Sequence, residues 1–233
     1  MNPGGQTRPY AVLGHPIAHT LSPCLHNAAF EALGWDALYL AFDVAPESLM
    51  EVLESMRRMG FRGVNLTVPH KEVAFAGLAE LDASARLAGA VNTVRMDAGG
   101  MRGFSTDGYG VLRAVREAFG SGPEGRRVVV LGSGGSARSL ALVCAGEGAA
   151  SVTVVARNRR KTEALLQELG ERYPAVAAIG VVDDAEQPEA VRGGELVVQA
   201  TPVGLHAGDP PLFPSAAFRE GQCVYDLIYS FPL

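Results

Sequence analysis

The sequence predicts two α/β domains, and three observations lead to this fold class. Short apolar runs alternate with helical patterns along the 233 residues, a rhythm typical of layered folds with largely parallel sheets. Residues 120–125 read GSGPEG and form the clearest break between folded segments. The glycine turn at residues 132–137 then follows a β-branched run and precedes a helical pattern. We expect an N-terminal α/β domain over residues 1–105 and a second α/β domain over residues 106–233.

Strands and helices alternate in the first half of the chain. The apolar runs predict strands over residues 10–14, 38–44, 62–68, 90–96 and 101–104. Ser22 and Pro23 fit the N-cap and the first position of a helix over residues 24–33. Residues 46–59 form a second helical pattern, and its apolar face consists of Leu49, Val52, Leu53 and Met56.

The glycine turn carries the fingerprint of a dinucleotide-binding Rossmann domain. Gly132, Gly134 and Ala137 fit G-x-G-x-x-[G/A], between an apolar run and a helical pattern. The first glycine permits the tight turn, the second lets the backbone approach a pyrophosphate, and the alanine keeps helix and sheet close. Amides at the helix N-terminus then attract phosphate oxygens. Apolar runs at residues 151–155, 196–199 and 223–227 continue the predicted sheet.

The residues after the second strand of this domain discriminate between NAD and NADP. An acidic side chain there binds the 2′-hydroxyl of NAD, whereas arginine accommodates the 2′-phosphate of NADP. Residues 156–161 read ARNRRK and contain no carboxylate. The helix dipole opposes cations at a helix N-terminus, which favours an anionic ligand over a merely solvated helix start. We therefore expect NADP as the cofactor, with Arg157 and Arg159 beside its extra phosphate.

Composition argues against several other classes of protein. The net charge is −5 and only residues 157–161 form a basic run, so nucleic acid is not an expected partner. No apolar stretch approaches the roughly 20 residues that span a bilayer, and residues 1–9 lack an apolar signal core. Cys24, Cys144 and Cys223 have no C-x-x-C spacing, which fits reduced thiols and a cytoplasmic location. The 5 histidines are scattered, so we expect no metal site.

Three polar stretches of the first half follow or interrupt predicted strands. Lys71 stands two residues after a proline, at a strand-to-helix corner, although an ordinary first-turn lysine would also fit. The pair Asn92-Thr93 interrupts an apolar strand, where polar side chains need partners. Thr106 and Asp107 begin a long helical pattern over residues 106–119, where N-capping is the simpler role. Taken singly, each stretch also fits a structural role.

Seven motifs nevertheless follow one another in a fixed order. The first half holds HTLSP at residues 19–23, NLTVPHK at 65–71, GAVNT at 89–93 and TDGYG at 106–110. The second half holds the glycine turn, the pair Asn158-Arg159 and ATPVG at residues 200–204. Together they resemble the shikimate dehydrogenase family over nearly the whole chain, from about residue 10 to residue 233. The resemblance implies NADP-linked, reversible reduction of 3-dehydroshikimate to shikimate in aromatic amino-acid (chorismate) biosynthesis.

The resemblance also implies roles for individual residues. Lys71 and Asp107 form the catalytic pair beside the reacting oxygen, where a cationic donor stabilises negative charge and supplies a proton. The implied substrate contacts are Thr20 and Ser22 at the carboxylate, Asn65, Thr67 and Asn92 at the ring hydroxyls, and Tyr229 near the carboxylate. The implied cofactor contacts are Gly132, Ser133, Gly134, Gly135, Ser136, Ala137, Arg157, Asn158, Arg159, Thr201, Gly204 and Leu227.

Some positions depart from the family's pattern. Thr20 replaces a more usual serine and adds a methyl group at the carboxylate end. Ser105 and Gln199 stand where asparagine is common. The chain ends at Leu233, where the family continues with further helices and a substrate-binding glutamine, so we expect this chain to turn over poorly while still binding NADP.

Two alternative functions stay open at this point. A quinate or quinate/shikimate dehydrogenase would use the same chemistry on a ring with an added hydroxyl, which Thr20 permits. A non-catalytic NADP-binding relative would bind the cofactor without turnover, although Lys71 and Asp107 are both present. The sequence does not discriminate between a monomer and a homodimer.

Overall fold

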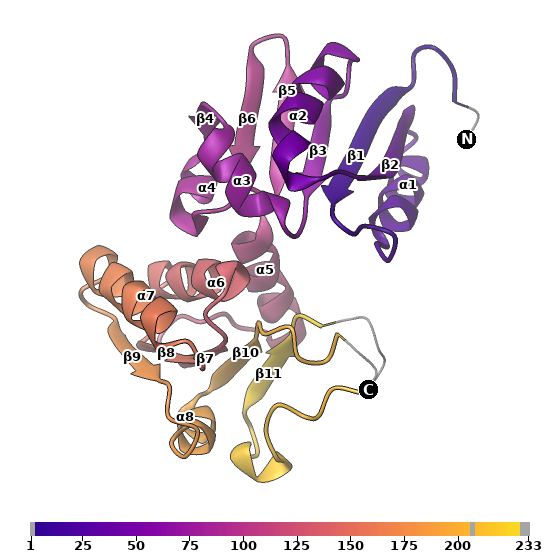
Figure 1. The fold of residues 1–233 in the computed structure, drawn as a ribbon. Helices are drawn as coiled ribbons and strands as arrows, with labels where there is room; N and C mark the ends of the chain where they lie inside the picture. The colour runs from indigo at the N-terminus through magenta and orange to yellow at the C-terminus, as the bar shows by residue number, and fades with distance from the viewer. Residues whose placement is uncertain (1–2, 206–207, 229–233) are drawn as a thin grey trace. The chain divides into compact units, whose positions relative to one another are not determined.

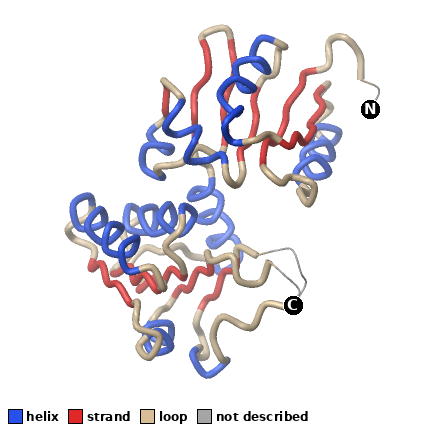
Figure 2. The backbone as a smooth tube through the Cα atoms, in the orientation of Figure 1, coloured by secondary structure: helices blue, strands red, loops and turns tan. Residues whose placement is uncertain are grey.

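The computed structural model describes residues 3–205 and 208–228. The chain forms two compact units, Met1–Thr106 and Asp107–Leu233. Each unit contains one sheet with helices beside it (Figure 1, Figure 2). The predicted fold class, two α/β domains, is confirmed. The boundary between the units falls after Thr106, one residue beyond the position expected from the sequence.

The N-terminal unit is built around a six-stranded sheet with the order β2-β1-β3-β5-β6-β4. Strand β1 lies parallel to both of its neighbours and β4 is parallel to β6, whereas β5 is antiparallel to β3 and to β6. Its elements are β1 (Arg8–Gly14), α1 (Ser22–Ala32), β2 (Ala37–Asp43), η1 (Pro46–Ser48), α2 (Leu49–Arg58), β3 (Gly63–Leu66), α3 (His70–Gly77), β4 (Glu80–Leu81), α4 (Ala83–Ala88), β5 (Thr93–Asp97) and β6 (Gly100–Phe104).

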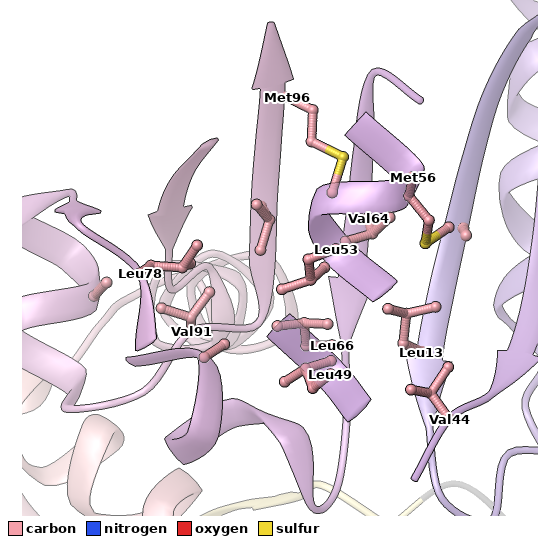
Figure 3. Packing of buried hydrophobic residues seen from close by; sticks show 14 residues of the cluster. Leu13, Val44, Leu49, Leu53, Met56, Val64, Leu66, Leu78, Val91 and Met96 are labelled. Atoms are coloured by element: carbon pink, nitrogen blue, oxygen red, sulfur yellow. The ribbon is translucent and has the colours of Figure 1, made fainter. Parts of the chain in front are cut away.

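Helix α2 covers one face of this sheet with the apolar stripe that the sequence predicts. Leu49, Leu53 and Met56 recur at helical spacing, and all three are buried. They pack in one cluster with strand residues that include Leu13 and Val64 (Figure 3). Burial contributes about 1.5–3 kcal/mol for each large apolar side chain. The stripe therefore anchors α2 to the sheet.

Helix α1 covers the opposite face. Side chains alternate between the two faces of a strand, so Val12 points away from the α2 cluster to which Leu13 belongs. Val12 packs with Phe30 of α1 and with Tyr39 of β2 in a second buried cluster. The sheet is thus covered on both faces, and the ends of its strands are left for polar residues.

The C-terminal unit contains a parallel five-stranded sheet with the order β11-β10-β7-β8-β9. From β7 the chain adds two strands on one side and then two on the other, which makes the gap between β7 and β10 a topological switch point. Its elements are α5 (Asp107–Phe119), β7 (Arg127–Leu131), α6 (Gly135–Gly146), β8 (Ser151–Val155), α7 (Arg159–Arg172), β9 (Ala177–Val181), α8 (Gln187–Gly193), β10 (Leu196–Gln199), η2 (Ser215–Ala217) and β11 (Cys223–Asp226).

Some local predictions are wrong at the level of single elements. Ser22 is not the N-cap of α1, because Leu21 takes that place and Ser22 is the first helical residue. The helical pattern over residues 46–59 divides into a 3-10 turn and α2. Strand β3 is shorter than the run at residues 62–68 that predicted it. The short strands β4 and β9 have no counterpart among the predicted strands.

Candidate active site

The C-terminal unit holds a cavity of about 770 Å³, referred to below as the C-terminal cavity. Three turns line it at the carboxyl ends of β7, β8 and β10, namely residues 132–134, 156–158 and 200–203. Ligands of open α/β sheets bind at this edge, beside the switch point. The cavity therefore lies where a dinucleotide is expected.

The glycine turn in this cavity has two glycines with different requirements. Gly132 has φ +112°, and a Cβ added there would lie 3.0 Å from the carbonyl oxygen of Ala200. Gly134 has φ −79°, and an added Cβ would meet no heavy atom within 4 Å among the described residues. Gly132 is thus needed by the backbone, whereas Gly134 keeps space open in front of α6. The first-turn amides of α6 face a site suited to an anion.

The end of β8 supplies polar and cationic groups to the C-terminal cavity. Arg157 and Asn158 both line it and are exposed. The Asn158 side chain also accepts a hydrogen bond of 3.0 Å from the backbone N–H of Lys161, which caps α7. Arg159 begins that helix, and its Nη1 lies 4.0 Å from Oε1 of Glu163. Arg157 is therefore the arginine of this segment that the cavity itself presents to a phosphate.

The loop after β10 is organised by Gln199, the residue that stands where asparagine is common. Its buried side chain accepts a hydrogen bond of 2.5 Å from the Thr201 N–H and donates one of 2.9 Å to the Val203 carbonyl. Gly204 follows with φ +100°, and its N–H donates to Oδ2 of Asp209 at 2.8 Å. The glutamine thus holds the cavity-lining loop from inside.

The predicted cofactor residues divide into two groups. Those that line the C-terminal cavity are Gly132, Ser133, Gly134, Arg157, Asn158 and Thr201. Those outside the cavity lining are Gly135, Ser136, Ala137, Arg159, Gly204 and Leu227, of which the first three begin α6. Sequence reasoning missed Asp184, Gln187, Pro188, Asp209 and Phe213, which also line the cavity. These residues come from loops and from the start of α8, where the sequence has no motif.

In the N-terminal unit, five polar side chains form a connected group that we call the polar network. It consists of Tyr39, Asn65, Asn92, Thr93 and Thr106. The antiparallel strand β5 places Thr93 opposite Asn65 of β3, and Phe104, at the end of β6, opposite Thr93. Residues far apart in the sequence therefore meet at one end of the sheet, the carboxyl end of β3.

The predicted catalytic pair consists of Lys71 and Asp107. Lys71 comes after strand β3 in the chain, and Asp107 comes after strand β6. Lys71 is the second residue of α3, and its carbonyl accepts a hydrogen bond of 3.0 Å from the Val91 N–H. Asp107 is the first residue of α5 and directly follows Thr106, whose N–H donates to Oδ1 of Asn92 at 2.9 Å. Local hydrogen bonds thus fix the backbone next to both residues.

Two of the predicted carboxylate contacts lie where the loop after β1 meets α1: Thr20 belongs to the loop, and Ser22 is the first residue of the helix. The Thr20 hydroxyl accepts a hydrogen bond of 3.3 Å from the Ser22 N–H and lies 3.2 Å from the Ser22 hydroxyl. Thr67, which is predicted to contact a ring hydroxyl, follows β3, and its N–H donates to the Leu13 carbonyl at 3.0 Å. Tyr229 lies outside the described residues. Thr20 and Ser22 are therefore neighbours with adjoining hydroxyls.

A histidine–aspartate pair stands at the same end of the sheet. Nδ1 of His15 lies 2.5 Å from Oδ1 of Asp43, and this hydrogen bond lowers the pKa of the carboxyl group. His70 is fully buried, and burial lowers the pKa of its imidazole.

Within residues 3–205 and 208–228, no three His, Cys, Asp or Glu side chains are grouped to hold a metal ion. None of the helices in the described part of the chain is long and apolar enough to cross a membrane.

These features define a class of protein. A Rossmann-type unit has a cavity at its glycine turn, and a second α/β unit carries a polar network and a lysine at one end of its sheet. Such a protein is a dinucleotide-dependent oxidoreductase.

Residues 12–94 match the family model of the shikimate dehydrogenase substrate binding domain. Residues 127–207 match the model described as NADP oxidoreductase, coenzyme F420-dependent.

Similar proteins carry the same family name. The shikimate dehydrogenase (NADP(+)) of Methanopyrus kandleri is 42% identical over 97% of this chain and 79% of its own length. The crystal structure of a shikimate dehydrogenase in complex with NADP+ has a TM-score of 0.87 at 33% identity, over 98% of this chain and 79% of that one. The Thermus thermophilus enzyme in complex with NADP(H) and shikimate has a TM-score of 0.82 at 38% identity, over 96% and 79%. The chain therefore belongs to the shikimate dehydrogenase family, which confirms the resemblance inferred from its motifs.

Proposed function

We propose that this chain catalyses the reversible, NADP-linked reduction of 3-dehydroshikimate to shikimate, a step of aromatic amino-acid biosynthesis. The observation that carries the proposal is the polar network at one end of the N-terminal sheet, in a chain of this family. Neighbouring amide and hydroxyl groups suit a ligand with several hydroxyls, since such groups both donate and accept hydrogen bonds. The cavity at the glycine turn suits the second ligand, a dinucleotide.

Lys71 and Asp107 are the residues that we assign to the chemistry. When bound, NADPH supplies the hydride. Lys71 donates a proton to the ketone oxygen as negative charge develops on it, and its ammonium group stabilises that charge. Asp107 orients the ammonium group and accepts a hydrogen bond from a ring hydroxyl. In the oxidative direction the same two groups act in reverse, with Lys71 accepting the proton.

The remaining assignments concern binding. Thr20 and Ser22 hold the substrate carboxylate with their adjoining hydroxyls. Asn65, Thr67 and Asn92 hold the ring hydroxyls. In the C-terminal cavity the glycine turn binds the pyrophosphate, as the open space at Gly134 permits. Arg157 and Asn158, with Arg159, hold the 2′-phosphate of NADP, and Thr201, Gly204 and Leu227 lie at the other end of the cofactor.

We assign the protein to the cytoplasm, without a nucleic-acid partner. Its three cysteines, Cys24, Cys144 and Cys223, are free, as expected in a reducing compartment. The net charge of −5 disfavours binding to a phosphate backbone. Analytical ultracentrifugation discriminates between the monomer and the homodimer.

The experiment that tests the proposed function offers the protein shikimate or quinate with NADP+ or NAD+, and follows the reduced cofactor by absorbance. We expect shikimate with NADP+ to give the highest kcat/KM of the four pairs. Quinate as the best substrate would establish the quinate/shikimate dehydrogenase instead. Binding of NADP+ without turnover of either substrate would establish a non-catalytic relative.

A further inference from the structure

The polar network has a fixed direction of hydrogen-bond donation. A backbone N–H can only donate, so the Thr106 N–H at 2.9 Å identifies Oδ1 of Asn92 as the acceptor. The Thr93 hydroxyl lies 3.0 Å from the same oxygen and therefore donates to it. Its remaining role towards Asn65 is that of acceptor, from Nδ2 at 3.0 Å. The amide of Asn65 consequently turns its nitrogen towards Thr93 and its oxygen towards Tyr39.

Tyr39 completes this chain of donors. Its hydroxyl lies 2.6 Å from Oδ1 of Asn65 and donates to it. The two Nδ2 hydrogens of Asn65 are already directed to the Thr93 hydroxyl and, at 3.3 Å, to the Asn92 carbonyl. After these three hydrogen bonds, the Asn65 side chain has one lone pair of Oδ1 left for a further hydrogen bond. Asn65 can therefore offer a ligand an acceptor and not a donor.

The tyrosine itself is held in place from helix α1. The His26 ring stacks on the Tyr39 ring, with centroids 4.3 Å apart and an interplanar angle of 13°. The Asn27 side chain accepts a hydrogen bond of 2.8 Å from the Tyr39 N–H and donates one of 2.9 Å to the Tyr39 carbonyl. Tyr39 is 3% exposed, and burial raises the pKa of its hydroxyl, so the group stays protonated and remains a donor.

We propose that Tyr39 is a positioning residue for substrate recognition: its hydroxyl orients the Asn65 amide so that Oδ1 accepts a hydrogen bond from a substrate hydroxyl. This inference rests on the proposed function, which supplies the hydroxylated ring. It adds a rule of specificity. The ring position that faces Asn65 must carry a hydrogen-bond donor, so a hydroxyl is accepted there, whereas a keto or ether oxygen is rejected. The energy lost with a wrong group is that of an acceptor left facing another acceptor.

A double-mutant cycle on shikimate binding tests this proposal. The variants are Tyr39→Phe, Asn65→Ala and the double variant, and calorimetry measures shikimate binding in the absence of cofactor. Tyr10→Phe is the matched control, because Tyr10 lies opposite Tyr39 on the neighbouring strand β1. We expect Tyr39→Phe to raise the shikimate Kd by about 3- to 10-fold, the value of one hydrogen bond. Steady-state kinetics should show the same rise in KM, with kcat and the NADP+ Kd unchanged.

The decisive result is whether the losses of binding free energy in the two single variants add up in the double variant. A positioning role predicts that the double variant binds shikimate no more weakly than Asn65→Ala, because Tyr39 acts through the amide that is already gone. The proposal would be overturned if the loss of binding free energy in the double variant equalled the sum of the two single losses, or if the shikimate Kd of Tyr39→Phe equalled that of wild type. Wild-type protein that binds shikimate without oxidising it would contradict the proposed function alone, since the cycle is read from binding. Wild-type protein that does not bind shikimate would overturn both.

Discussion

In the N-terminal unit the polar network consists of side chains that bond to one another, whereas the C-terminal cavity is lined mainly by turns at the ends of strands. The network depends on amides and hydroxyls, such as Asn65 and Asn92, whose partners come from different strands. The cavity depends on a backbone conformation, which Gly132 permits with φ +112°. A ring with several hydroxyls requires many directed side chains. A pyrophosphate requires exposed amides and free space.

This difference makes the two sites sensitive to different substitutions. Removing a functional group at the end of the N-terminal sheet should impair recognition or chemistry while the chain continues to bind its cofactor. Adding a single carbon atom to the glycine turn should impair cofactor binding. Each of the following predictions tests one side of this contrast, beginning with the largest effect.

Replacing Lys71 is expected to have the largest effect. Lys71→Ala removes the proton donor and the charge beside the reacting oxygen, and kcat for shikimate oxidation should fall by about 100- to 10,000-fold. Lys71→Arg should retain more activity than Lys71→Ala, because it keeps a cation although its geometry differs. Glu72→Ala, an exposed neighbour in the same helical turn, should match wild type. An equal loss in Glu72→Ala would show that α3 is merely disrupted.

Replacing Arg157 should change the selectivity for the cofactor. Arg157→Ala removes a charge-assisted contact with the 2′-phosphate, so the Kd of NADP+ should rise by about 10- to 100-fold. The Kd of NAD+, which lacks this phosphate, should stay near its wild-type value. Arg113→Ala removes an exposed arginine of α5 that pairs with Glu117 and serves as the control. Equal weakening of both cofactors in Arg157→Ala would place the 2′-phosphate elsewhere.

The two glycines of the turn should separate stability from binding. Gly132→Ala forces a side chain into φ +112° and to within 3.0 Å of the Ala200 oxygen, so the free energy of unfolding should fall by about 1–3 kcal/mol. Gly134→Ala meets no such obstacle among the described residues and should change stability by less than about 1 kcal/mol. Its added methyl group should nevertheless weaken NADP+ binding. Denaturant titration and calorimetry measure the two effects, and unchanged NADP+ affinity in Gly134→Ala would contradict the placement of the pyrophosphate.

The smallest expected effect concerns pH. Burial lowers the pKa of His70 in the folded chain, so below about pH 6.5 the unfolded chain binds a proton that the folded chain does not. Stability should therefore fall as the pH is lowered, by at most about 1.4 kcal/mol per pH unit from this group. Urea unfolding at pH 7.5 and 5.5 should show a smaller loss for His70→Gln than for wild type. The exposed His19 provides the control, His19→Gln, and an identical pH dependence in all three proteins would exclude His70 as its source.

Local sequence patterns predicted much of the fold. The runs at residues 151–155 and 196–199 coincide with β8 and β10, because buried parallel strands are short, apolar and β-branched. Strand β9 gave no such signal, since it consists of Ala177–Val181 with two alanines, a glycine and the half-exposed Ile179. Its place in the sheet depends on pairing with β8, a tertiary effect. The prediction that Ser22 is an N-cap was wrong, because the Ser22 hydroxyl lies beside Thr20 instead of capping the helix.

The site was predictable where polar residues stand out from an apolar run. Asn92 is such a residue, and the structure gives its amide partners in Thr93 and Thr106. Tyr39 was not predictable, because an aromatic residue in a strand is typical of a core and its partner Asn65 lies 26 residues away. Gln187, which lines the C-terminal cavity, is the first residue of α8, where no spacing marks a contact.

The separation between cofactor binding and chemistry is tested most directly by the NADP+ dissociation constant of the Lys71→Ala protein. Isothermal titration calorimetry on this variant, beside wild type and Glu72→Ala, measures it without any turnover. We predict a Kd within about two-fold of wild type, because Lys71 belongs to the N-terminal unit and the glycine turn and Arg157 to the C-terminal cavity. Weakening as large as that expected for Arg157→Ala would contradict this division of roles.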